Sequence, residues 1–142
     1  MKTLYTAHAD AVGGREGHVA TDDKQVDFNL AGPGGNKKGT NPEQLFACGY
    51  AACFGSAVQH VAKLQKINLS GEVDVHADVT LNQDDNGFFI GVELNVSLPG
   101  LDAATAQKLV QEAHKVCPYS KATKGNIEVK LKVNNQSLKQ AA

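Results

Sequence analysis

The chain has 142 residues, of which 42% are hydrophobic and 20% charged, and its formal net charge is -1. This length and composition predict one globular domain over residues 1–142, with a single core. The near-neutral charge excludes binding modes that depend on a strongly basic surface, so neither nucleic acid nor an anionic membrane is expected as a partner. A small, neutral substrate fits better.

The sequence also restricts the cellular compartment. Residues 1–8 contain no continuous apolar segment of the signal-peptide kind, and no later apolar run approaches the roughly 18 residues of a transmembrane helix. We therefore expect a cytoplasmic protein. The three cysteines are an odd number, and the cytosol disfavours structural disulfides. A cysteine pair here is expected to be catalytic, redox-active or metal-binding.

Short strands are predicted for the first part of the chain. Residues 2–8 alternate weakly, a pattern that Gly13 and Gly14 end, and a strand–turn–strand unit follows over residues 17–30. Arg15 lies in the turn between them, where a solvated loop arginine is the ordinary interpretation. Residues 32–39 are glycine-rich but lack the Gly-Lys-Ser/Thr ending of a P-loop, so we expect a loop or lid.

A long, almost uncharged helix is predicted over residues 42–64. Asn41 is a good N-cap, Pro42 suits the first helical position, and Gln44 completes a capping box. From residue 45 onward the helix carries no charge until Lys63. A helix that is apolar nearly all round is expected to be buried on most sides. We expect a second copy of the chain to supply part of that burial.

Two alternating segments, residues 71–81 and 88–98, predict a long antiparallel hairpin. An Asp-Asp-Asn-Gly turn separates them, and their apolar residues fall on one face. A final strand is expected over residues 127–133, and the polar tail from Asn134 is expected to fray.

A second helix is predicted over residues 103–116, with Asp102 as its cap. Pro118 is expected to end it and to hold Cys117 in an extended conformation. Strands and helices in this order predict an α+β fold with antiparallel sheet.

The three cysteines occupy different settings. Cys53 lies in the middle of the apolar helix, where burial alone would raise its pKa, so its reactivity requires a cation. Cys117 lies where a helix ends, and a cysteine that can swing out suits a resolving thiol. Cys48 lies about 140° around the helix from Cys53 and cannot pair with it, so we expect it in the core.

Other uses of these residues are weaker. His114-x-x-Cys117 is half of a metal site, but no second closely spaced pair completes four ligands, so no metal is expected. Ser56 and Ser120 lack the glycine pattern of a serine hydrolase. General disulfide exchange is disfavoured because Cys53 and Cys117 are 64 positions apart. A non-enzymatic dimer that binds a hydrophobic ligand or senses oxidation is the alternative from another class.

Three motifs resemble the organic hydroperoxide resistance (Ohr) branch of the OsmC superfamily. They are Asn-Pro-Glu-Gln-Leu-Phe-Ala-Cys-Gly-Tyr-Ala-Ala-Cys-Phe at residues 41–54, Val-Cys-Pro-Tyr-Ser-Lys-Ala-Thr at 116–123, and Gly-Arg-Glu-Gly at 14–17. Tyr50 and Tyr119 fit the Ohr branch better than its OsmC relatives. Cys48 departs from the pattern, which has a small residue such as alanine there.

This resemblance implies an intertwined homodimer in which antiparallel sheets enclose long central helices. It also implies an antioxidant thiol peroxidase, without metal or prosthetic group, that acts in the response to oxidative stress. Cys53 would be the peroxidatic residue and Cys117 the resolving one, with Arg15 and Glu43 setting the thiolate. Organic hydroperoxides would become alcohols through a Cys53 sulfenic acid and a redox-active Cys53–Cys117 disulfide.

The resemblance further implies that an external dithiol resets the enzyme. The expected reductant is dihydrolipoamide, carried as dihydrolipoyl groups on a lipoylated partner protein. Apolar surroundings from Phe46, Tyr50 and Phe54 are expected to bind substrate and to favour alkyl or fatty acyl hydroperoxides over hydrogen peroxide.

The spacing of two site residues bears on the dimer. Glu43 and Cys53 are ten residues apart, which is about 15 Å on a straight helix, nearly too far for one guanidinium to touch both. Either the helix breaks near Gly49, or Arg15 and Glu43 reach Cys53 from the partner chain. We favour the second explanation, a composite active site.

Overall fold

The computed structural model describes residues 1–138, and the chain divides into two compact units between Leu45 and Phe46. Each unit is described by itself, and the single domain over residues 1–142 stays a prediction. The α+β fold is confirmed, since two sheets and several helices are present.

The first unit contains a three-stranded antiparallel sheet in the order β1-β2-β3. Its strands are β1 (Ala9–Val12), β2 (His18–Thr21) and β3 (Asp27–Asn29). The predicted strand–turn–strand is therefore confirmed. The predicted strand over residues 2–8 is wrong, because β2 ends at Thr21, opposite Ala9, and offers earlier residues no partner strand.

A short 3₁₀ helix, Gly14–Glu16, links β1 to β2, and the glycine-rich segment 32–39 is a loop as predicted. The two are tied together by Glu16. Its Oε1 accepts a hydrogen bond from the Gly32 backbone at 3.1 Å, and its carbonyl oxygen accepts one from Lys37. The turn that carries Arg15 is thus attached to the loop.

Helix α1 spans Pro42–Leu64, as the sequence predicts. Asn41 Oδ1 accepts a hydrogen bond from the Gln44 backbone N–H at 2.9 Å, which satisfies one of the free donors at the helix start. The Gln44 side chain accepts a hydrogen bond from Thr40 instead of completing the capping box. The helix is unbroken at Gly49, so the first explanation for the Glu43–Cys53 spacing is wrong.

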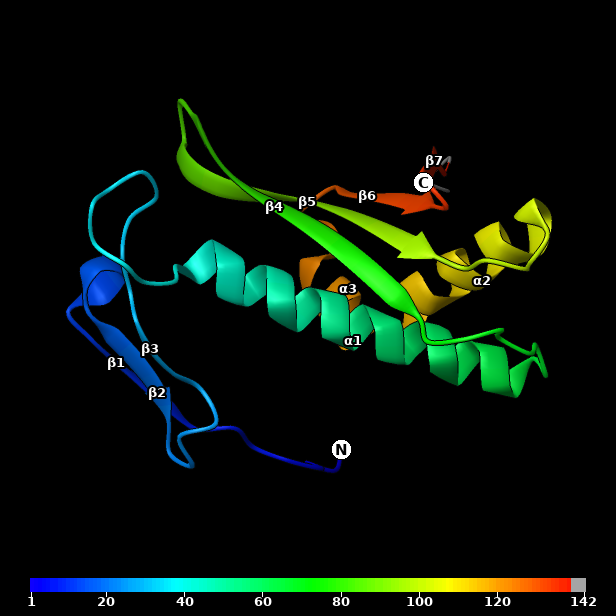
Figure 1. Cartoon of the computed structure of the whole chain (residues 1–142), viewed down its shortest axis with the longest axis horizontal. Coiled ribbons are helices and arrows are strands. Elements are labelled where there is room, and N and C mark those ends of the chain that lie inside the picture. Colours follow the sequence, from blue (N-terminus) through cyan, green and yellow to red (C-terminus); the bar gives the residue numbers. More distant parts are fainter. Residues whose placement is uncertain (139–142) are drawn as a thin grey trace. The chain divides into compact units, whose positions relative to one another are not determined.

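The second unit contains the sheet β4-β5-β6-β7. Its strands are β4 (Asp74–Asp84), β5 (Gly87–Ser97), β6 (Val129–Val133) and β7 (Gln136–Ser137). The β4–β5 hairpin is confirmed, but β6 pairs with β5 in parallel, not antiparallel as expected. A parallel neighbour needs a crossover connection, and the helices between β5 and β6 supply it (Figure 1).

Helix α2 (Ala103–Val116) begins at Asp102, whose side chain accepts a hydrogen bond from the Thr105 backbone at 3.0 Å, as predicted. Helix α3 (Pro118–Thr123) was not predicted. The same proline that ends α2 occupies the first position of α3, which proline favours.

The predicted fraying of the tail from Asn134 is wrong for the residues described. Asn134 and Asn135 form a turn with positive φ, β7 pairs with β6, and Leu138 is buried. Residues 139–142 of that prediction lie outside the described part of the chain.

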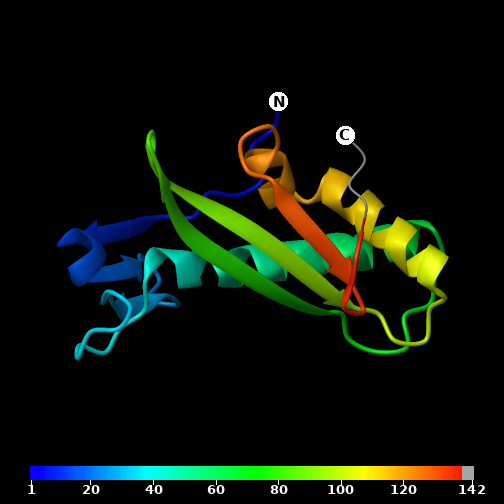
Figure 2. The same ribbon diagram turned by 90° about the horizontal axis from the view of Figure 1, so that it is seen from above.

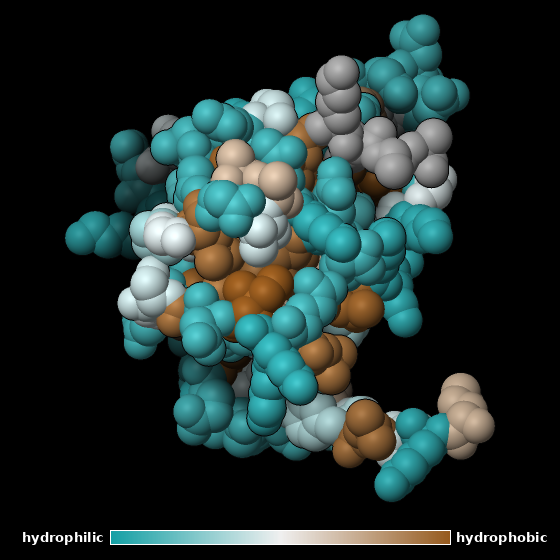
Figure 3. Space-filling view, turned by 90° about the vertical axis from the view of Figure 1, so that its right-hand side faces the viewer, coloured by the Kyte–Doolittle hydropathy of each residue, from teal (hydrophilic) through white to brown (hydrophobic). Residues whose placement is uncertain are grey.

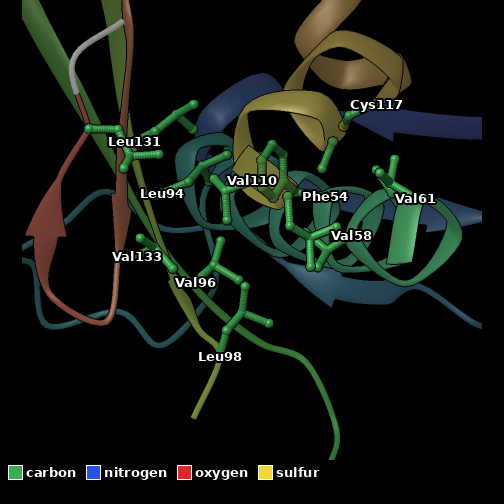
Figure 4. Packing of buried hydrophobic residues seen from close by; sticks show 14 of the residues in the cluster. Phe54, Val58, Val61, Leu94, Val96, Leu98, Val110, Cys117, Leu131 and Val133 are labelled. Carbon is green, nitrogen blue, oxygen red and sulfur yellow. The ribbon is translucent and has the colours of Figure 1, made fainter. Parts of the chain in front are cut away.

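The core lies between one face of this sheet and helices α1 and α2, which cover that face together (Figures 1 and 2). Figure 4 shows core side chains of the sheet, of α1 and of α2 lying together between these elements. The sheet contributes alternate residues of β5 and β6, as the predicted period of two requires. These are Val92, Leu94, Val96, Val129, Leu131 and Val133.

Helix α1 is buried on one face only, through Tyr50, Phe54, Ala57, Val58, Val61 and Ala62. The expectation that Cys48 lies in the core is wrong, because it lies on the opposite, exposed face. In the end view of Figure 3, hydrophobic surface is exposed between hydrophilic side chains. Part of the apolar surface of this chain is therefore exposed to solvent on this face.

The sequence-based statement about membrane spans also needs correction. Helix α1 is long and apolar enough to cross a membrane by length and composition alone. A core helix passes the same test, and the buried residues of α1 pack against the sheet and α2.

We predict that Leu109→Ala will lower the free energy of unfolding by about 2–5 kcal/mol, because a fully buried leucine leaves a cavity when truncated. Urea denaturation followed by circular dichroism measures this loss. Lys108→Ala, at the exposed neighbouring position, is the control and should change stability little. Equal losses for the two variants would contradict the assigned core.

Candidate active site

Two cysteine sulfurs face each other in the second unit. Cys53 lies on α1 and is half-buried, whereas Cys117 lies at the junction of α2 and α3 and is fully buried. Their Sγ atoms are 3.5 Å apart. The structure therefore brings together the two residues that the resemblance pairs, although they are 64 positions apart in the chain.

Local backbone geometry explains the position of Cys117. It is extended, with φ -61° and ψ 124°, and it serves both as the last cap of α2 and as the first cap of α3. This conformation is what Pro118 imposes on the residue before it. Cys117 belongs to the buried core cluster (Figure 4), so it does not swing out in this state.

The surroundings of Cys53 oppose ionisation. Burial raises the pKa of its thiol, a hydrogen bond with the Tyr119 backbone lowers it, and the neighbouring Cys117 raises it further. A thiol with a raised pKa is mostly protonated at neutral pH, and the thiolate is the nucleophile. A cation is still required for reactivity, as the sequence predicts.

A cation and its carboxylate partner occur together in the first unit. Arg15, in the 3₁₀ turn, donates two hydrogen bonds to Glu43, in the first turn of α1. The Nη1–Oε2 distance is 2.9 Å. The hydrogen bond from Arg15 holds the pKa of Glu43 below its usual value, and the same bond raises the pKa of Arg15. The fork is thus held by two parallel bonds while 51% of the arginine side chain stays exposed.

Aromatic rings surround the second-unit site. Tyr119 packs on Phe46 and Tyr50, with ring centroids 5.8 and 5.5 Å away, and Tyr50 contacts Phe54. Tyr50 and Phe54 have no exposed surface, whereas Tyr119 is 36% exposed. Of the three predicted substrate-binding residues only Phe46 is accessible here, whereas Tyr50, which packs on it, and Phe54 are buried in the core.

Tyr119 is a site residue for which the sequence analysis assigned no role. Its position depends on Gly49, because a Cβ at residue 49 would lie 2.5 Å from the Tyr119 hydroxyl oxygen. Only a residue without a side chain lets the ring lie this close to α1. The sequence signal that could have placed Tyr119 is Pro118, because proline also favours the first position of a helix.

The ligands of a metal site are not assembled here. Within residues 1–138 no group of three or more His, Cys, Asp or Glu side chains is placed to hold a metal ion. His114, which with Cys117 formed the half-site considered above, instead lies 2.8 Å through Nδ1 from the Ser120 hydroxyl.

Comparisons with known proteins agree on one family. The family model described as "OsmC-like protein" matches residues 34–132. The organic hydroperoxide resistance protein of Xanthomonas axonopodis pv. citri is 53% identical over 134 residues, covering 92% of this chain and 94% of that protein. OhrB of Bacillus subtilis is 50% identical, covering 92% of this chain and 98% of that protein.

Solved structures give the same result. The crystal structure of Bacillus subtilis OhrB superposes with a TM-score of 0.88 at 49% identity, covering 93% of this chain and all of that one (100%). An organic hydroperoxide resistance protein from Elizabethkingia anophelis gives a TM-score of 0.87 at 50% identity, covering 96% and 100%.

We predict that Glu43 titrates below the ordinary glutamate value of about 4.3. Because its pKa is lowered in the folded chain, the ion pair is present at neutral pH and is lost as the pH falls through that lowered value. A ¹³C NMR titration of the Glu43 carboxyl measures the midpoint. Arg15→Gln should move the midpoint upward, and Lys38→Gln, a charge-matched control in the exposed loop, should not; an unmoved midpoint in Arg15→Gln would contradict the pairing.

Proposed function

Since the chain belongs to the OsmC-like family, within its organic hydroperoxide resistance branch, we propose that it is a thiol-dependent peroxidase that reduces organic hydroperoxides to alcohols. The membership itself supports a role in organic hydroperoxide resistance and the response to oxidative stress. The observation that carries the finer proposal is the Cys53–Cys117 pair, with its sulfurs 3.5 Å apart.

The first step oxidises Cys53, the more exposed of the two thiols. Its thiolate attacks the peroxide oxygen remote from the organic group, and the O–O bond breaks. An S–OH bond forms, so Cys53 becomes a sulfenic acid, and the alkoxide leaves and takes a proton to become the alcohol.

The second step uses Cys117. Its sulfur attacks the oxidised Cys53 sulfur, an S–S bond forms, and the hydroxyl leaves as water with the thiol proton. The resulting disulfide protects Cys53 from further oxidation. An external dithiol then restores both thiols by exchange and is itself oxidised to a disulfide. We propose dihydrolipoyl groups on a cytoplasmic lipoylated protein as that dithiol, with no prosthetic group on this chain.

Arg15 and Glu43 supply the missing activation. Arginine keeps its charge throughout the catalytic cycle and lowers the pKa of a neighbouring thiol. Glu43 holds the guanidinium through the two hydrogen bonds described above. In this proposal the pair acts on Cys53 of the other copy in an intertwined homodimer, so that the active site is composite.

The aromatic residues favour an apolar substrate. Phe46 and Tyr119 carry the accessible part of the ring cluster, and the buried Tyr50, which also contacts Phe54, packs against both. Alkyl or fatty acyl chains gain hydrophobic contact there that hydrogen peroxide cannot make. The proposed substrates are therefore bulky organic hydroperoxides.

We predict that Cys53→Ser will lower cumene hydroperoxide consumption at least about a thousandfold, because the nucleophile is lost. Cys117→Ser should still react once at a similar rate, but should recycle poorly with dihydrolipoamide. Peroxide consumption with dihydrolipoamide, thioredoxin or glutathione measures both effects and identifies the reductant.

Cys48→Ser is the control and should keep full turnover, because Cys48 lies on the face of α1 away from the core. Full turnover in Cys53→Ser would overturn the proposed peroxidase. Equal turnover with glutathione and dihydrolipoamide would overturn only the proposed reductant.

We predict that mixing Arg15→Ala and Cys53→Ser chains will restore about a quarter of wild-type activity, since half of the dimers are mixed and each has one intact site. Peroxide consumption after co-refolding measures it. Mixing Arg15→Ala with Glu43→Ala is the control and should restore nothing, because these two side chains pair within one chain. A first mixture as inactive as its parents would show that the site forms within one chain.

A further inference from the structure

A second set of contacts joins the same three helices that carry the sulfurs. Tyr50 lies on α1, His114 on α2 and Ser120 on α3. The Ser120 hydroxyl oxygen lies 2.8 Å from the Tyr50 hydroxyl and 2.8 Å from His114 Nδ1. Tyr50 is 0% exposed and Ser120 2%, whereas His114 is half-buried, so this hydrogen-bonded chain runs from the core to its edge.

Its members are regularly placed about the two thiols. Tyr50 precedes Cys53 by three residues on the same helix, so the two side chains lie about one turn apart. His114 precedes Cys117 by three residues, and Ser120 follows it by three. Ser120 therefore connects α1 to both sides of the junction that holds Cys117.

One arrangement of hydrogen atoms satisfies all three members of the Tyr50–Ser120–His114 chain. In the neutral tautomer that carries its hydrogen on Nε2, His114 Nδ1 accepts the Ser120 hydroxyl hydrogen, and Ser120 then accepts from Tyr50. Burial, followed by the charge of Lys124, lowers the pKa of His114 and favours this neutral form. Thr123 donates to the Ser120 carbonyl oxygen at 3.1 Å. Among residues 1–138 no buried side-chain polar atom lacks a partner.

The sulfur pair cannot hold the junction in place by itself. A thiol is a weak donor, and the present separation of 3.5 Å is well beyond the disulfide length of about 2.05 Å. Cys117 must therefore approach Cys53 further during the reaction. The buried Tyr50–Ser120 bond is the stronger polar link between α1 and the junction, and the partly buried Ser120–His114 bond joins α3 to α2 across it.

We propose that the Tyr50–Ser120–His114 chain positions Cys117 for attack on oxidised Cys53, with Ser120 as the central positioning residue. This inference rests on the proposed function, in which Cys117 sulfur displaces hydroxide from the Cys53 sulfenic acid and water leaves. When these hydrogen bonds are lost, the α2–α3 junction samples positions from which Cys117 cannot attack Cys53. The sulfenic acid then survives long enough for a second peroxide to oxidise it to sulfinic acid.

The test separates positioning from peroxide chemistry by using 4,4′-dithiodipyridine on reduced, full-length protein in a Cys48→Ala background. Cys53 attacks the reagent and releases one thiopyridone, and Cys117 then attacks the mixed disulfide and releases a second. Ser120→Ala should leave the first release within about twofold and slow the second at least about tenfold. Stopped-flow absorbance measures both releases.

Three variants make the result specific. Tyr50→Phe keeps the buried ring but removes the hydroxyl contacts with Ser120 and Thr123, and should slow the second release by a smaller factor. Ser120→Thr keeps the hydroxyl and should restore most of the rate. Leu109→Ala lowers stability but changes none of Tyr50, Ser120 and His114, so its second release should be as fast as that of the parent protein.

A second measurement uses peroxide itself. Mass spectrometry after repeated cumene hydroperoxide turnover should find more Cys53 sulfinic acid in Ser120→Ala than in the parent, and no increase in Ser70→Ala. That control removes a hydrogen bond to the Pro99 carbonyl oxygen elsewhere in the same unit.

The possible failures can be told apart. A parent protein that releases both thiopyridones quickly but consumes no peroxide would overturn the proposed peroxidase and leave the positioning role standing. The positioning role is overturned if Ser120→Ala and Tyr50→Phe resolve as fast as the parent, if Leu109→Ala slows the second release as much as Ser120→Ala does, or if the parent itself resolves slowly.

Discussion

The packing of one face of α1 against the sheet and α2 is the constraint on which the second unit depends. Phe54 and Val58 belong to one buried cluster with residues of β5 and β6 (Figure 4). The partly buried Cys53 packs against this cluster. The burial that stabilises the fold therefore also fixes the proposed nucleophile in position. It has a chemical cost, because burial raises the pKa of Cys53 and a cation must reverse that effect.

The second thiol reaches Cys53 through a backbone device. Pro118 ends one helix and starts the next, which leaves Cys117 extended between them and pointing into the core. Tyr119 can then lie across Gly49, where any side chain would collide with it. The two sulfurs thus approach within 3.5 Å because of a proline and a glycine that carry no chemistry themselves.

Much of the fold and of the candidate site follows from the sequence, because the sequence signals for both are local. The cap at Asn41, the β4–β5 turn and the cap at Asp102 depend on residues within a few positions of each other, and each lies where predicted. The resemblance, carried by short motifs, selected Cys53 and Cys117 before any contact was known. Their adjacency and the Arg15–Glu43 pair agree with that selection.

What the sequence determined by itself was therefore the α+β class and the main helices, and it selected the candidate site residues. Only the tertiary structure decided the parallel β5–β6 pairing, the exposure of Cys48, the burial of Tyr50 and Phe54, and the chain through Ser120. These depend on which surfaces distant segments present to one another. A periodic pattern shows that a residue is apolar, but only packing partners decide whether it is covered.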